Sequence, residues 1–364
     1  MKNKHIFAIF YTTILIIATA WSLLDTFVIA DKIAVVDETS ANTSIYTDLE
    51  NEYTTSISSN SALDENVSSV NSESIVDVDA ANSSSDSISD EDVANSSLDS
   101  SLDSDSDSAS SDDSDSVVPV ITDYSYQDAN IQITIDVIRE YNTDIYVADV
   151  VVSDVAYLKT AFAQNTYGRN IKETTSEIAD DHDAILAING DYYGFRNSGF
   201  VIRNGVLYRT TAADRTSEAL IVAADGNFEI VNESSSDAQT LYDEGALQAF
   251  SFGPALITDG EISVTSNSEV SKSKSSNPRT AIGMVDPLHY VFIVSDGRTS
   301  QSAGLSLLEL AEIMQEYGCT EAYNLDGGGS STMVFNGKVI NNPTDGRSYG
   351  ERRVSDIIYI GEYL

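Results

Sequence analysis

The acidic tract of residues 37–118 constrains the fold most, because it keeps a long part of the chain out of any packed core. It contains 26 Ser, 21 Asp or Glu and no Lys or Arg. Such a segment cannot bury enough apolar surface to offset its conformational entropy, and its charges repel one another. We predict that residues 31–119 form a disordered Ser/Asp-rich linker, with ends on the order of 50 Å apart.

A targeting segment precedes this linker. Lys2 and Lys4 stand before an apolar run of 19 residues, 6–24. About 20 apolar residues span a bilayer as a helix, whereas the core of a cleavable signal has about 7 to 15. The pattern favours a signal anchor over residues 1–30 that crosses the cell membrane once and leaves the C-terminal domain extracellular. Secretion after cleavage beside Ala30 is the alternative.

Residues 120–364 are numerous enough for one large domain with its own core. They carry 16 Lys or Arg against 35 Asp or Glu, a net charge of −19, which argues against nucleic acid as a partner. Cys319 is the only cysteine, so no intrachain disulfide is expected. The three histidines are scattered, which argues against a histidine metal site or a Ser-His-Asp triad.

The domain reads as an α+β fold, a mostly antiparallel sheet domain with a few helices. Thr174 with Glu177, and Ser306 with Glu309, have the spacing of capping boxes and predict helices over 174–182 and 306–317. A further strand is expected over the apolar stretch 249–257, where the Gly253-Pro254 pair indicates a bulge or bend. Strands are expected at 131–137, 144–152, 184–188, 200–203, 206–209, 219–223, 228–231, 277–284, 288–295, 320–325, 332–335, 338–340 and 357–360.

An aspartate next to a glycine recurs where predicted strands end. Asp191 follows the apolar run 184–188, Asp296 follows the strand 288–295, and Asp326 follows the strand 320–325. Any one of them could be ordinary turn chemistry. Because Arg279 and Arg298 are interleaved with them, the sequence predicts one shared pocket.

The loop after Asp326 is the densest candidate site. Gly327, Gly328 and Gly329 lack a Cβ, so a ligand could approach their amides closely, and Ser330 and Ser331 add two hydroxyls. The loop lacks the Gly-Lys-Ser/Thr ending of a P-loop and precedes a strand, which excludes nucleotide binding of that kind.

At these positions the sequence resembles the phosphodiester glycosidase family, to which the lysosomal uncovering enzyme belongs. The anchor and acidic linker resemble its bacterial members related to exopolysaccharides. The resemblance covers residues 131–360 and rests on residues 305–314 and six motifs. These are Ala187-Ile-Asn-Gly-Asp-Tyr-Tyr193, Ile202-Arg-Asn-Gly205, Phe252-Gly-Pro254, Pro278-Arg-Thr-Ala-Ile-Gly283, Asp296-Gly-Arg298 and Asn324-Leu-Asp-Gly-Gly-Gly-Ser-Ser-Thr-Met333.

The resemblance implies an extracellular hydrolase that cleaves the C1–O bond of a sugar-1-phosphodiester in a cell-wall or exopolysaccharide-type glycan. A phosphomonoester leaves easily, so little general-acid help is needed. The candidate catalytic residues are Asp191, Asp326 and Asp296. Those for substrate binding are Asn189 and Asn324 for sugar hydroxyls, and Arg279, Arg298, Gly327, Gly328, Gly329, Ser330 and Ser331 for the phosphate and its surroundings.

Three questions stay open at this point. Retaining and inverting mechanisms differ in the separation of their carboxyl groups, so the role of each aspartate is undecided. A divalent metal on these oxygens is open as well, and hard oxygen ligands favour Ca²⁺ or Mg²⁺. The alternative function is a non-catalytic polysaccharide-binding or adhesin-like module on a Ser-Asp stalk, which would bind glycans without turnover.

Overall fold

The structure is a computed structural model that describes residues 118–362 apart from 216, 269–275 and 347, and, nearer the N-terminus, residues 12, 14–19 and 31–32. Residues 12 and 14–19 are helical. No helix in the described part of the chain is long and apolar enough to cross a membrane. Most of the predicted signal anchor, and residues 33–117 of the predicted linker, lie outside the described residues.

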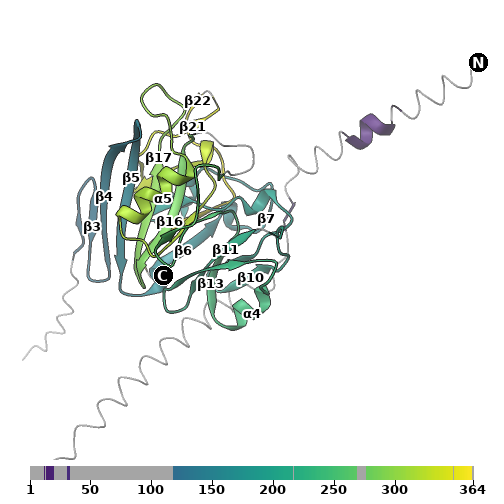
Figure 1. The fold of residues 1–364 in the computed structure, drawn as a ribbon, viewed down its shortest axis with the longest axis horizontal. Coiled ribbons are helices and arrows are strands. Elements are labelled where there is room, and N and C mark those ends of the chain that lie inside the picture. Colours follow the sequence, from purple (N-terminus) through teal and green to yellow (C-terminus); the bar gives the residue numbers. More distant parts are fainter. Residues whose placement is uncertain are drawn as a thin grey trace, which may run out of the picture. The chain divides into compact units, whose positions relative to one another are not determined.

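A nine-stranded antiparallel sheet forms the largest part of the domain (Figure 1). Alternate residues of β4 are buried, so one face of this strand packs inward. In spatial order the strands are β15 (Glu261–Ile262), β14 (Ala255–Thr258), β18 (Glu321–Asn324), β16 (Arg279–Asp286), β17 (His289–Ser295), β5 (Thr143–Val152), β4 (Ile131–Glu140), β3 (Ser125–Gln127) and β2 (Val120–Ile121).

Two five-stranded antiparallel sheets complete the framework. One has the order β20 (Lys338–Val339), β19 (Met333–Phe335), β8 (Leu186–Asn189), β23 (Asp356–Ile360) and β6 (Leu158–Phe162). The other has the order β10 (Val206–Arg209), β9 (Val201–Arg203), β13 (Ala246–Phe250), β11 (Glu218–Ala223) and β12 (Phe228–Asn232). Two small ribbons pair β1 (Asp31–Lys32) with β7 (Gly168–Arg169), and β21 (Thr344–Asp345) with β22 (Ser348–Tyr349).

The three large sheets share one hydrophobic core. Phe292 of the nine-stranded sheet, Ile188 and Ile358 of the β8 sheet and Leu220 of the β11 sheet belong to the same buried cluster. Because each sheet turns one face to this cluster, the ends of strands from different sheets meet around its rim.

Each large sheet is covered on its other face by one helix. α5 (Leu307–Glu316) packs against β14, β15 and β18, and its apolar residues share a buried cluster with residues of β16 and β17. α3 (Thr175–Asp181) packs on β8 and β23, and α4 (Ala238–Asp243) packs beside β10 and β13. Four 3-10 turns lie between strands: η1 (Val155–Tyr157), η2 (Ala163–Asn165), η3 (Tyr193–Phe195) and η4 (Gly328–Ser330).

The predicted fold class is confirmed for the described domain, where every strand pairing is antiparallel and helices are few. Both predicted capping boxes are present. The expectation of two helices was wrong, because α4 is a third. It is capped by Asp237 and has six residues, too few for a helical period to show.

The Gly253-Pro254 pair has a larger role than a bulge. The peptide bond between them is cis, and the strand predicted over residues 249–257 is two strands in two different sheets, β13 and β14. The Asn324 side chain donates to the Gly253 carbonyl over 2.8 Å, and this bond fixes the crossover beside the end of β18.

Candidate active site

Two strand ends are joined where the Asp326 loop begins. The Asn189 amide donates to the Asp326 carbonyl over 2.6 Å, and the Asp326 N–H donates to the Gly190 carbonyl over 3.3 Å. The Asn189 side-chain oxygen accepts from the Thr280 hydroxyl over 2.8 Å. β8, β16 and β18 therefore meet at Asn189, which is fully buried.

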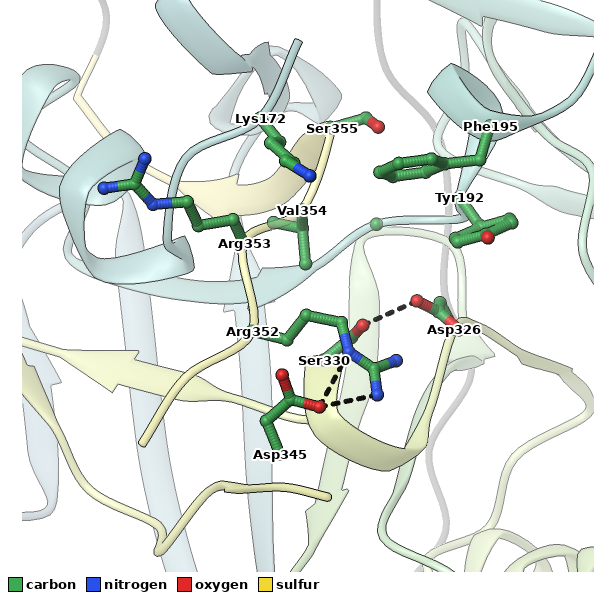
Figure 2. A pocket seen from close by; sticks show the side chains of 11 residues that line it. Lys172, Tyr192, Phe195, Asp326, Ser330, Asp345, Arg352, Arg353, Val354 and Ser355 are labelled. Atoms are coloured by element: carbon green, nitrogen blue, oxygen red, sulfur yellow. Dashed lines mark hydrogen bonds and ion pairs between the residues drawn. The ribbon is translucent and has the colours of Figure 1, made fainter. Parts of the chain in front are cut away.

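A cleft with two lobes opens beside this junction. The larger lobe has a volume of about 370 Å³ and the smaller one of about 310 Å³. Tyr192, Asp326 and Arg352 line both of them. Figure 2 shows the larger lobe, with Asp326 beneath Tyr192. Asp326 is thus the carboxylate at the boundary between two binding spaces.

The Asp326 carboxylate is held by its own loop. Its Oδ2 accepts from the Ser330 hydroxyl over 2.6 Å, within the turn formed by the glycines. Burial raises the pKa of Asp326 above its ordinary value, while the Ser330 hydroxyl, Arg352 and Arg196 act in the opposite direction. The group is therefore a positioned carboxyl whose proton is lost at higher pH than usual.

An aromatic wall and a cation line the larger lobe. The rings of Tyr192 and Phe195 stack with centroids 4.6 Å apart. The Lys172 ammonium lies 5.9 Å from the centre of the Phe195 ring, and Figure 2 shows it beside the two aromatic side chains. Stacked aromatic rings offer flat apolar faces that suit a sugar ring.

An ion pair forms the opposite side of this lobe. Arg352 donates from Nε and Nη2 to Asp345 Oδ1 over 3.1 and 2.8 Å. A Cβ at Gly329 would lie 2.6 Å from Asp345 Oδ1 and 2.7 Å from Arg352 Nη2. The third glycine of the loop is therefore needed for the close approach of this pair.

Besides Arg352, which lines both lobes, three guanidinium groups line the smaller lobe: those of Arg196, Arg279 and Arg298. Arg279 is 4% exposed, and its Nε donates to the Leu305 carbonyl over 2.9 Å. Burial and the neighbouring Arg298 lower the pKa of Arg279 to about 10. Two cations placed so close to one another suit a ligand that carries a negative charge.

Arg298 and Arg196 are held from different sides. Arg298 donates from Nε and Nη2 to the Asn277 side-chain oxygen over 3.3 and 3.1 Å. Arg196 donates to the Ser251 carbonyl over 3.1 Å, and its guanidinium lies 4.8 Å from the centre of the Phe252 ring. Both groups are therefore pre-positioned, which lowers the entropy lost when a ligand binds.

The structure separates Asp191 from the cleft. Asp191 is completely buried and forms an ion pair with Arg203 over 2.9 Å. Its other oxygen accepts from the Ser251 N–H over 2.8 Å. Arg203 also pairs with Asp356 over 2.8 Å, so the three side chains form a buried ionic network. Asp191 lines neither lobe.

Three other predicted residues also face the protein interior. Asp296 accepts from the Asn342 N–H over 2.8 Å and from the Asn341 amide over 3.3 Å, so it fixes the loop that leads to Asp345. Asn324 holds the Gly253 carbonyl, and Asn189 holds the Asp326 carbonyl. None of these three residues lines a lobe.

The glycine loop shapes the cleft, while several of its amides bond within the protein. The Gly328 N–H donates to the Pro278 carbonyl over 2.8 Å, and the Ser330 N–H donates to the Gly327 carbonyl over 3.3 Å. Ser331 is fully buried. Gly327 and Gly328 line the smaller lobe and Ser330 the larger one.

Sequence reasoning missed most of the cleft's cationic and aromatic lining. Arg352, Arg196, Lys172 and Phe195 were not predicted, and Tyr192 entered only as part of the motif that ends at Tyr193. One signal was available: Arg352 belongs to an Arg-Arg doublet in a domain with few basic residues.

The described residues contain no group of three or more His, Cys, Asp or Glu side chains that could hold a metal ion. The three aspartates predicted for the site also lie in different surroundings, since Asp191 pairs with Arg203 and Asp296 bonds to amides. The three aspartates therefore do not form one shared set of carboxylates, and a role for Ca²⁺ or Mg²⁺ stays a prediction.

The fold is similar to that of a solved catalytic domain. The structure of the catalytic domain of zebrafish N-acetylglucosamine-1-phosphodiester alpha-N-acetylglucosaminidase, auto-inhibited by its pro-peptide, superposes with a TM-score of 0.51 and 22% identity. It covers 64% of this chain and 83% of that one. The chain therefore has the fold of this class of catalytic domain.

Residues 182–361 match the model of the phosphodiester glycosidase family. This match confirms, for these residues, the resemblance to the phosphodiester glycosidase family seen in the motifs.

Two curated relatives show how far the likeness extends. The SPbeta prophage-derived uncharacterized protein YomE of Bacillus subtilis (strain 168) is 34% identical over 200 residues, 53% of this chain and 30% of that protein. The human N-acetylglucosamine-1-phosphodiester alpha-N-acetylglucosaminidase is 27% identical over 190 residues, 48% and 36% of the two chains. The chain spans about a third or less of the length of the curated relatives it matches.

Proposed function

We propose that the domain hydrolyses the glycosidic C1–O bond of a sugar-1-phosphodiester and releases a sugar and a phosphomonoester. The observation that carries this proposal is the position of Asp326, between a lobe with a stacked aromatic wall and a lobe lined by four guanidinium groups. The match of residues 182–361 to the phosphodiester glycosidase family and the names of the human, mouse and bovine relatives support the same reaction.

The two lobes fit the two halves of such a substrate. The sugar ring would lie against Tyr192 and Phe195 in the larger lobe. The phosphate would lie in the smaller lobe between Arg279 and Arg298, whose planar groups bind phosphate oxygens in pairs. The anomeric carbon then lies beside Asp326.

In this arrangement, bond cleavage moves the electron pair of the C1–O bond to the phosphate oxygen. The arginines of the smaller lobe stabilise the charge that develops there. Asp326 acts at the oxocarbenium-like carbon, either by attacking C1 or by taking the proton of the attacking water. Asp345 is the second carboxylate of the larger lobe, and its bond to Arg352 places it opposite the aromatic wall.

The remaining predicted residues act as positioning residues under this proposal. Asp191 anchors the segment that carries Tyr192, since it also accepts from the Tyr193 N–H over 3.2 Å. Asn189 and Asn324 fix the strand ends, and Asp296 fixes the loop before Asp345.

The test is an Asp326→Asn variant assayed with a synthetic sugar-1-phosphodiester. We expect sugar release to fall by about 100-fold to 10,000-fold while the circular dichroism spectrum and thermal unfolding stay unchanged. The matched control is Asp123→Asn, an exposed carboxylate on the β2–β3 turn that lines neither lobe. Full activity of Asp326→Asn would remove this carboxylate from the mechanism.

Two further experiments test the role of a metal and the alternative of a non-catalytic binding module. Assays with EDTA, and with added Ca²⁺ or Mg²⁺, test whether a divalent metal takes part. Saturable binding of a glycan phosphodiester by the wild-type domain with no sugar released would support the non-catalytic binding module instead.

We also propose that this hydrolysis takes place outside the cell membrane, on a cell-wall or exopolysaccharide-type glycan. The apolar run 6–24 after Lys2 and Lys4, and the acidic stretch after it, support this location. Protease added to intact cells should then remove a tag placed after Leu364, whereas a cytoplasmic domain would keep the tag until lysis.

A further inference from the structure

The basic residues of an acidic domain gather around its cleft. Residues 120–364 contain 16 Lys or Arg against 35 Asp or Glu. Among the described residues, the acidic side chains that line the two lobes are those of Asp326 and Asp345. The basic ones are those of Lys172, Arg196, Arg279, Arg298, Arg352 and Arg353. The excess of acidic residues is thus reversed at the cleft, which favours an anionic ligand.

The basic side chains are divided between the lobes, so a single phosphate in the smaller lobe would contact only some of them. Arg196, Arg279 and Arg298 surround the smaller lobe, where the proposed function places the reacting phosphate. Lys172 and Arg353 line the larger lobe alone, on the side proposed for the sugar. A neutral sugar would offer no counter-charge to the cations on that side.

Lys172 differs from its basic neighbours in the larger lobe. Arg352 is paired with Asp345, and Arg353 lies 3.9 Å from Glu177 and points away from the cavity in Figure 2. Within the part of the chain that the structure describes, Lys172 forms no ion pair, and its contact is with the Phe195 ring. Its charge is therefore available to a ligand.

A second polar group lines the same lobe. Ser355 is 2% exposed, and its hydroxyl has no hydrogen-bond partner among the described residues. A buried hydroxyl of this kind gains stability when a ligand supplies an acceptor. Lys172 and Ser355 together offer a charge and a hydroxyl donor at the sugar end of the cleft.

We propose that the larger lobe takes a sugar that itself carries a negative charge, a phosphate or a carboxylate, and that Lys172 recognises this charge. The substrate is then a phosphodiester within a polyanionic glycan, charged on both sides of the bond that breaks. This inference rests on the proposed function for the position of the sugar in the larger lobe.

The experiment compares three diesters that share one aglycone: a neutral hexose-1-phosphodiester, its 6-phosphate and the corresponding uronic acid. For the wild-type protein we expect kcat/KM to be highest for one of the charged sugars, which identifies the anion. Lys172→Met keeps the aliphatic contact with Phe195 and should lower kcat/KM for that substrate by about fivefold or more. The value of kcat/KM for the neutral diester should fall less, so the preference for the charged sugar should narrow.

Two variants control for charge and for position. Lys172→Arg keeps the charge and should keep the preference. Lys338→Met removes an exposed lysine of the β19–β20 hairpin, which lines neither lobe, and should change none of the rates. Equal kcat/KM values for the neutral and charged diesters in the wild-type protein would overturn the proposal.

A binding measurement separates failure of this inference from failure of the proposed function. Calorimetry with hexose 6-phosphate, the uronic acid and the neutral hexose needs no catalysis. Tighter binding of a charged sugar that is lost in Lys172→Met supports the subsite even if no diester is hydrolysed. Equal binding of all three sugars contradicts it, whatever the hydrolytic activity.

Discussion

The Ser330 hydroxyl lies 2.6 Å from Asp326 Oδ2, so the glycine loop turns back to hold the carboxylate that begins it. Gly328, at φ +66° between these two residues, permits the turn. The bond fixes the side-chain rotamer of Asp326 at the boundary of the two lobes, and it also stabilises the charged form of this carboxyl group.

The Ser330→Ala variant should shift the pH dependence of hydrolysis. Burial raises the pKa of Asp326 and the Ser330 hydroxyl opposes this rise, so its removal raises the pKa further. Asp326 is proposed to act when deprotonated, and activity is lost as pH falls through its pKa. The acidic limb of the kcat/KM profile should therefore move to higher pH, while the rate at high pH changes less. An unmoved limb would show that another group controls it.

The Gly329→Ala variant should lose activity and stay folded. The new Cβ would lie within 2.7 Å of the Arg352 and Asp345 side-chain tips, which can move aside but then lose their bonded geometry. We expect kcat/KM to fall about tenfold or more, since charge-assisted hydrogen bonds each contribute about 1.5–3 kcal/mol. Steady-state kinetics and thermal unfolding measure both properties.

The control for this variant is Gly337→Ala on the β19–β20 turn. Gly337 has φ +73° and nothing lies within 4 Å of its would-be Cβ. The substitution should lower the free energy of unfolding by about 1 kcal/mol through backbone strain alone. Hydrolysis should be unaffected, and an equal loss of activity in both variants would contradict the role of Gly329.

The Arg203→Met variant should be strongly destabilised. Arg203 is 2% exposed and pairs with Asp191 and Asp356, so its removal leaves two buried carboxyl groups without a counter-charge. The free energy of unfolding measured with urea should fall by about 3–5 kcal/mol. Arg139→Met removes an exposed ion pair and should cost less than about 1 kcal/mol.

The Asp356→Asn variant should change how stability depends on pH. Burial raises the pKa of Asp356 to about 7, against an ordinary value of 3.8, although Arg203 opposes the rise. Between these values the folded protein binds a proton that the unfolded chain does not, so this group's contribution to stability falls as pH rises and is constant above about 7.

The measurement is urea denaturation of both proteins between pH 5 and 8. The difference in unfolding free energy, wild type minus Asp356→Asn, should decrease up to about pH 7 and then level off. A difference that stays constant over this range would mean that Asp356 is charged throughout.

Local sequence patterns predicted most of the secondary structure. Alternation of apolar residues identified β4 and β5, and the capping boxes placed the starts of α3 and α5. These features depend on residues close together in the chain, so they can be predicted from the sequence. The division of residues 249–257 between two sheets was not visible, because it depends on the pairing partners of β13 and β14.

The sequence by itself determined that a carboxylate, a triglycine turn and arginines lie at strand ends, and Asp326, Arg279 and Arg298 do line one cleft. Only the tertiary structure decided which aspartates reach it. Asp191 and Asp326 have the same Asp-beside-Gly signature, but Arg203 and Asp356 enclose Asp191. The physical reason is that a buried charge needs a counter-charge. Arg203 of β9 supplies it, and Asp356 of β23, far along the chain, holds the same guanidinium group.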